Sequence, residues 1–175
     1  MAARVLAIVA GLLLAEPTGA AADDVYQPPE EFLSEVFGGS PPAPETLWLT
    51  GELKSQAESI MGHGLGVLRI RYWGRDKRTA WILEEIGKER PITTGFVVAN
   101  SRIEQVKVLI YRESRGYEVR YPVFTDQFRN AALTPDLGLT ANVDGISGAT
   151  LSVRALTRLA RLALFLHSHT PYSRD

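Results

Sequence analysis

Short apolar runs separated by turn-forming residues fill the middle of the chain, which is the pattern of consecutive β-strands. Four segments rich in β-branched and aromatic side chains are predicted as strands: residues 67–73, 78–85, 92–99 and 103–111. The connections between them are short, so we expect neighbouring strands to pair as antiparallel hairpins.

Apolar residues at helical spacing lie on both sides of this strand region. Helices are predicted over residues 28–37, from near Thr50 to Met61, over 124–130 and, as a long terminal helix, over 147–167. Gly38 and Gly39 end the first helix, and Gly62 follows the second. The order of elements predicts an α+β fold, in which an antiparallel sheet of about four to five strands has helices on one side.

The N-terminus has the features of a signal peptide. Arg4 precedes an apolar run over residues 5–15, and small residues at 19–22 precede an acidic pair. The run is shorter than the roughly 20 residues that cross a bilayer, so cleavage near Ala22 is favoured over a retained anchor. We therefore expect three parts: a signal peptide (1–22), an N-terminal helix with a proline-rich connector (23–46) and one main domain (47–175).

Composition excludes several kinds of chemistry. The chain has 175 residues, with 19 basic and 20 acidic side chains and no cysteine. Disulfides, iron–sulfur clusters and thiolate catalysis are therefore excluded, and without a basic patch we expect no nucleic-acid partner. His63, His167 and His169 are isolated or lie near the C-terminal end, so we expect no bound metal in the resting protein.

Residues 144–150 carry the most informative motif. Ser147 is a candidate N-cap of the terminal helix, and Gly148 and Ala149 allow a ligand to approach the backbone closely. Because a helix start has unpaired N–H groups and partial positive charge, it favours an anion such as phosphate. Thr150 then offers a nucleophilic oxygen, while Asp144 could either assist its reaction or form a turn with Gly145.

The terminal helix also carries a stripe of arginines. Arg154 lies one turn beyond Thr150 and is a candidate partner for a phosphate, whereas Arg158 and Arg161 are expected to form an ordinary solvated face.

Residues 144–150 resemble the flavinylation motif Asp-x-x-Ser/Thr-Gly-Ala-Ser/Thr of the FMN-binding domain family, with Thr150 as the last residue. The family includes flavoprotein subunits of the sodium-translocating NADH:quinone oxidoreductase and of the Rnf complex. The resemblance covers roughly residues 50–167 and includes a Phe-x-x-Gln-Phe pattern at 124–128. It implies that a flavin transferase, with FAD as donor, joins the phosphate of FMN to the Thr150 hydroxyl.

The same resemblance implies that Glu113, Ser114, Arg115 and Gly116 line the flavin, although many relatives have Thr-Pro-Gly-Leu in this loop. Five aromatic residues are candidates either for contact with the flavin ring or for the core: Trp48, Trp73, Trp81, Tyr111 and Tyr117. No Ser-His-Asp or Cys-His arrangement is legible, so the chemistry is expected to reside in the flavin.

The sequence therefore predicts an exported flavoprotein, in the periplasm or on the outer face of the cytoplasmic membrane. It would transfer electrons between a membrane-bound donor and an extracytoplasmic acceptor. Two alternatives stay open: a flavin-dependent reductase of a small acceptor such as a ferric chelate or quinone, and a flavin-free exported binding module.

Overall fold

A single antiparallel sheet organises the chain. The computed structural model describes residues 23–173, so the predicted signal peptide at residues 1–22 lies outside the described residues. The sheet has six strands in the order β1-β6-β5-β4-β3-β2. Their bounds are β1 Asp24–Val25, β2 Glu45–Trp48, β3 Arg69–Arg75, β4 Arg78–Ile86, β5 Pro91–Ala99 and β6 Arg102–Tyr111.

The four predicted strands correspond to β3, β4, β5 and β6, and the α+β class is confirmed. The sheet has one strand more than the upper expectation because two short edge strands were missed. β1 pairs Asp24 with Tyr111, and β2 pairs with β3 from Glu45↔Tyr72 to Trp48↔Arg69. Segments of two and four residues are too short to show a period in the sequence.

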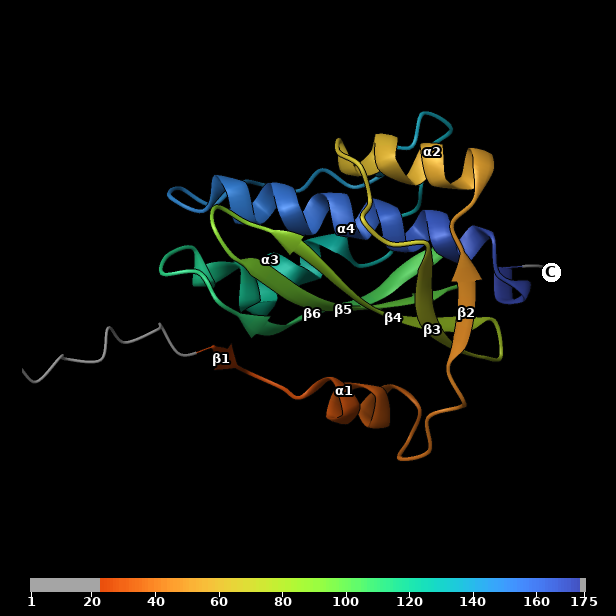
Figure 1. Ribbon diagram of the computed structural model, residues 1–175. Helices are drawn as coiled ribbons and strands as arrows, with labels where there is room; N and C mark the ends of the chain where they lie inside the picture. The colour runs from red at the N-terminus through yellow and green to blue at the C-terminus, as the bar shows by residue number, and fades with distance from the viewer. Residues whose placement is uncertain (1–22, 174–175) are drawn as a thin grey trace, which may run out of the picture.

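Helices cover the sheet in two unequal layers (Figure 1). On one face lie α2 Gly51–Met61, α3 Pro122–Thr125 and the long α4 Thr150–Ser168. The helix predicted over residues 124–130 is instead α3 followed by a 3₁₀ turn that ends at Phe128. The first helix, α1 Pro29–Val36, lies on the opposite face. Short 3₁₀ helices at Tyr117–Arg120 and Asp126–Phe128 flank α3. None of the helices in residues 23–173 is both long and apolar enough to span a membrane.

The larger core fills the space between the sheet and α4. Trp81 and Phe96 from the sheet pack with Leu156 and Leu159 from α4, all of them buried. A smaller core lies on the other face, where Phe32 of α1 covers the sheet. Gly95 permits this contact, since a Cβ atom there would lie only 2.6 Å from the Phe32 ring.

The terminal helix begins three residues later than predicted. Ser147 and Gly148 form a turn, Gly148 has a φ of 83°, and the Ala149 N–H donates to the Ile146 carbonyl at 3.0 Å. Ala149 occupies the N-cap position and no side chain caps the helix. The prediction of Ser147 as N-cap is therefore wrong, because the left-handed residue after it turns the chain before the helix starts.

Candidate functional site

A cavity of about 600 Å³ lies where the loop after β6 meets the first turn of α4. Residues from three separate parts of the chain line it: Lys88; Glu113, Ser114 and Arg115; and Gly148, Ala149, Thr150, Leu151 and Ser152. The structure thus brings together two groups of predicted site residues that lie far apart along the chain.

Thr150 is the first residue of α4 and its side chain is exposed at this cavity. Within residues 23–173 no side chain caps this helix, so the N–H groups of its first turn lack a capping acceptor there. Lys88 and Arg115 add positive charge to the cavity wall. The exposed Thr150 hydroxyl, the start of α4 and two cationic side chains therefore border the same cavity.

Tyr111 connects the loop after β6 to the first turns of α4. Its hydroxyl donates to the Arg115 carbonyl at 2.6 Å and lies 3.0 Å from the Ser152 hydroxyl. Since the single tyrosine proton is used by Arg115, the Ser152 hydroxyl donates to the Tyr111 oxygen. Burial raises the pKa of Tyr111, which keeps this group neutral and able to donate.

Gly116 lies directly behind the cavity and makes the close packing possible. It has a φ of 86°, and a Cβ atom there would lie 2.9 Å from the Tyr111 hydroxyl and 3.2 Å from the Ala149 Cβ. We therefore assign Gly116 to packing of the loop on α4 rather than to the cavity wall.

Sequence reasoning did not assign these fastening roles. Ser152 is a polar residue on the buried face of α4, which is the signal that could have identified it. For Tyr111, the hydroxyl contacts depend on two segments that the sequence does not show to be adjacent.

Glu113 holds the turn between β4 and β5. Its Oε1 accepts the backbone N–H groups of Lys88, Glu89 at 2.7 Å and Arg90 at 3.0 Å. Burial acts to raise the pKa of Glu113, but these three N–H bonds outweigh it and hold the pKa below its usual value. Glu113 is therefore ionised at neutral pH and fixes the turn that carries Lys88 into the cavity wall.

The remaining predicted residues lie outside the cavity lining. The Asp144 backbone N–H donates to Gln127 Oε1 at 2.7 Å, which ties the motif segment to the Phe-x-x-Gln-Phe segment, and the Asp144 side chain is exposed. Ser147 is exposed in the turn before α4, and Arg154 is exposed on the helix.

The arginine face of α4 differs from the prediction. Arg158 lies 3.6 Å from the Glu85 carboxylate, and Arg161 donates to the Leu137 carbonyl at 2.5 Å. Both side chains are half-buried rather than simply solvated. The reason is that α2 and the segment near Leu137 extend over this side of the helix.

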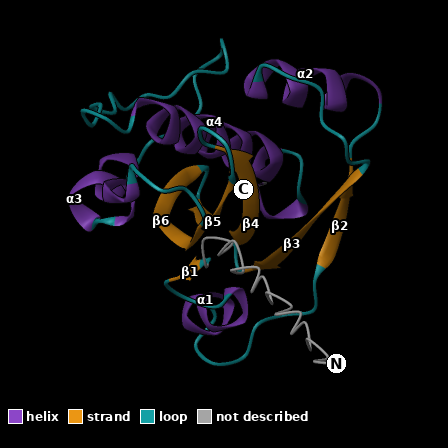
Figure 2. Ribbon diagram, turned by 60° about the vertical axis from the view of Figure 1, so that its left-hand side comes forward, coloured by secondary structure: helices purple, strands orange, loops and turns teal. Residues whose placement is uncertain are grey.

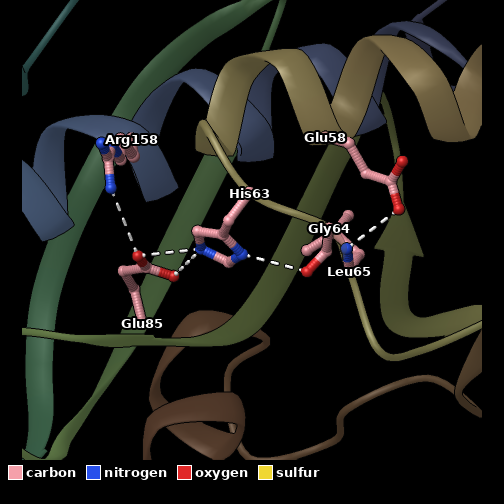
Figure 3. Close-up of polar contacts among 6 residues, drawn as sticks. All are labelled: Glu58, His63, Gly64, Leu65, Glu85 and Arg158. Atoms are coloured by element: carbon pink, nitrogen blue, oxygen red, sulfur yellow. Dashed lines mark hydrogen bonds and ion pairs between the residues drawn. The ribbon is translucent and has the colours of Figure 1, made fainter.

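His63 completes a polar cluster with Glu85 and Arg158 (Figure 3). Its Nε2 lies 2.9 Å from the Glu85 carboxylate, and its Nδ1 lies 3.0 Å from the Gly64 carbonyl. The expectation that His63 is isolated is wrong, because the turn after α2 brings it over β4. No group of three or more metal-ligating side chains occurs within the described part of the chain.

Comparison with known proteins was informative in one case. A family model described as FMN-binding domain matches residues 87–164, which include Lys88, the loop at 113–116 and the motif at 144–150. No curated protein and no solved structure shows significant similarity to the chain. The match at residues 87–164 supports a flavin-binding role, with FMN as the cofactor.

Proposed function

We propose that this protein is an exported electron-transfer flavoprotein that holds FMN covalently on Thr150 through a phosphodiester. The observation that carries the proposal is the cavity of about 600 Å³ at which an exposed Thr150, an uncapped helix start and residues 113–115 meet. All three lie within the matched FMN-binding region.

The residues present fit a phosphorylated cofactor. The free N–H groups at the start of α4 and the cations Lys88 and Arg115 would hold the phosphate, and Gly148 and Ala149 leave room beside the Thr150 hydroxyl. In attachment, the Thr150 hydroxyl replaces AMP at the FMN phosphorus of FAD and loses its proton, with a flavin transferase as catalyst. Bound FMN supplies one- and two-electron redox chemistry.

A tether of this kind suits the compartment that the N-terminal sequence predicts. Flavin is made in the cytoplasm, and a protein exported after cleavage near Ala22 would lose a loosely held cofactor by dilution. With the flavin fixed, the protein would relay electrons from a membrane-bound donor to an acceptor outside the cytoplasmic membrane.

Intact mass spectrometry tests the proposal most directly. Coexpression with an active flavin transferase is expected to add about 438 Da, the mass of FMN less one water, to the wild-type protein. Thr150→Ala should remove the addition and Thr150→Ser should retain it.

Thr157→Ala is the matched control, because Thr157 lies on the same helix with its hydroxyl bonded to the Val153 carbonyl at 2.8 Å. This variant should keep the added mass. An unmodified wild-type protein would contradict covalent attachment and favour a flavin-free binding module.

A further inference from the structure

A second cavity opens where the sheet splits between β3 and β4. The pairing of these strands runs from Arg75↔Arg78 to Tyr72↔Trp81 and stops there. Beyond that point residues 69–71 pair only with β2, and residues 82–86 pair only with β5. Figure 2 shows β3 diverging from β4 along this stretch. The split leaves a cleft of about 610 Å³.

The walls of the cleft are mainly apolar. Side chains from the sheet, from α2 with the loop after it and from α4 contribute: Met61, Leu65, Val67, Ile70, Ile82, Leu83, Ile110, Leu159 and Leu162. The volume lies within the range of about 300–1,000 Å³ typical of sites for small ligands. α4 thus borders both cavities, but none of these residues lines the cavity at Thr150.

One end of the cleft is cationic. Arg69 and Arg71 line it and also line an adjoining hollow of about 280 Å³ with Thr46. Both arginines are exposed, and within the described part of the chain neither makes an ion pair with a carboxylate. Arg69 lies over the Trp48 ring at 5.9 Å, a contact that restricts its guanidinium.

The one carboxylate among the cleft residues is already engaged. Glu84 accepts from the Thr93 hydroxyl at 2.5 Å and lies 3.5 Å from Arg112. It therefore does not neutralise Arg69 or Arg71, and the two arginines are left to bind an anion from outside the chain.

We propose that this cleft binds an amphiphile with one long apolar chain and an anionic head group. The apolar chain would lie between β3 and β4 against Ile82, Leu159 and Leu162, and the head group would contact Arg69 and Arg71. The charge at the mouth selects an anionic head over a neutral one, and the mainly apolar lining on both sides of the split suits a hydrocarbon chain. This site is separate from the flavin cavity and does not depend on flavin attachment.

Fluorescence titration with 11-(dansylamino)undecanoate tests the site in the purified protein. We expect saturable binding that oleate displaces and that oleyl alcohol displaces at least tenfold less well. Arg69→Gln with Arg71→Gln should weaken binding about tenfold or more. Val67→Asp should weaken it about fivefold or more by placing a like charge at the apolar mouth, and Val67 tolerates this change because it is 49% exposed.

Matched controls locate the binding. Arg115→Gln with Arg154→Gln removes the same charge from the flavin cavity and the exposed face of α4, and Val123→Asp adds the same charge at a side chain that is 84% exposed on α3. Both controls should leave the affinity within about twofold of wild type. Absence of saturable binding, equal displacement by oleyl alcohol, or losses in the controls equal to those in the test variants would overturn the proposal.

Cosedimentation with vesicles identifies the source of the amphiphile. Phosphatidylcholine vesicles with and without about 30% phosphatidylglycerol are compared. Binding that needs phosphatidylglycerol and is lost in the Arg69 and Arg71 variant supports a membrane lipid. Binding of oleate without vesicle association supports a free long-chain carboxylate.

Discussion

At the scale of single residues, His63 has the clearest pH dependence. Its two ring nitrogens face the Gly64 carbonyl and the Glu85 carboxylate, so only the doubly protonated ring donates to both. The bond to the Gly64 carbonyl, and then the bond to Glu85, raise the pKa of His63 above its ordinary value. The positive form therefore fastens the turn after α2 to β4.

This gives a defined sign for stability against pH. The contribution of His63 is fully present below the unfolded pKa of about 6.5 and is lost as pH rises through the raised folded value. Because the side chain is nearly half exposed, we expect a loss below about 1 kcal/mol. Urea unfolding between about pH 5.5 and 8.5 should show this loss of stability in the wild type and not in His63→Gln. Parallel profiles of stability against pH in the two proteins would contradict the role of His63.

His167 should act in the opposite direction. It is fully buried, its Nδ1 lies 2.8 Å from the Thr79 hydroxyl, and its Nε2 has no partner among the described residues. Burial lowers the pKa of His167 to about 4. The contribution of neutral His167 to folding stability is therefore fully present above the unfolded pKa of about 6.5. Roughly 3 kcal/mol of stability is lost as the pH falls from there toward the folded pKa.

Acid titration of stability tests this expectation. His167→Gln should flatten the loss of urea stability between about pH 6.5 and 4, relative to wild type. Carboxylates contribute to the acid loss in both proteins, so the difference isolates His167. An equally steep profile in the variant would mean that another group is responsible.

The sequence could place those residues whose positions depend on local structure. Thr150, Gly148 and Ala149 are adjacent in one motif, and their position at the cavity follows from the turn and helix that they form. Three other contacts each join segments more than 20 residues apart. They are the bond between Tyr111 and Ser152, the bonds from the turn at 88–90 to Glu113, and the ion pair of Arg158 with Glu85. Such contacts depend on strand register and helix placement, which no local pattern specifies.

At the scale of elements, the β4–β5 turn is fixed by a residue outside it. Glu113 Oε1 accepts three consecutive backbone N–H groups at residues 88–90. Glu113→Ala should release the turn, so amide exchange at these residues should become at least tenfold faster and covalent flavin loading should fall. Hydrogen exchange followed by NMR measures the first effect, and intact mass measures the second.

Glu89→Gln is the control for the Glu113 variant. Glu89 lies in the same turn, but among residues 23–173 its carboxylate forms an ion pair only with the Lys88 ammonium, and both side chains are about 70% exposed. Amide exchange should stay at the wild-type rate. If Glu113→Ala also leaves exchange unchanged, the turn is rigid without the carboxylate and Glu113 must contribute in another way.

Element boundaries show a similar division between local and non-local causes. The four central strands are seven to ten residues long, and each either alternates polar with apolar residues or is largely apolar. This length made them predictable from the sequence. β1 and β2 are strands only because β6 and β3 offer them edges to pair with. The position of α1 on the opposite face is equally non-local, since its apolar stripe would fit either side of the sheet.

At the scale of the whole molecule, the two faces of one sheet contribute to the two cores. Trp81 and Phe96 face the core under α4, while their strand neighbours Ala80 and Val97 face α1. Because successive residues of a strand point to opposite faces, a change on one face is transmitted through the same backbone to the other. We therefore expect the two layers to unfold together.

Phe32→Ala tests this coupling. Phe32 is fully buried against Gly95, and its truncation should lower the free energy of unfolding by about 3–5 kcal/mol in a single transition. Urea unfolding followed by tryptophan fluorescence measures it, with the exposed Glu31→Ala on the same helix as control. Flavin loading of the folded variant should stay unchanged, because no residue of α1 lines the cavity at Thr150. Two separate transitions would instead mean that α1 is an independent layer, whose loss leaves the sheet and the flavin cavity intact.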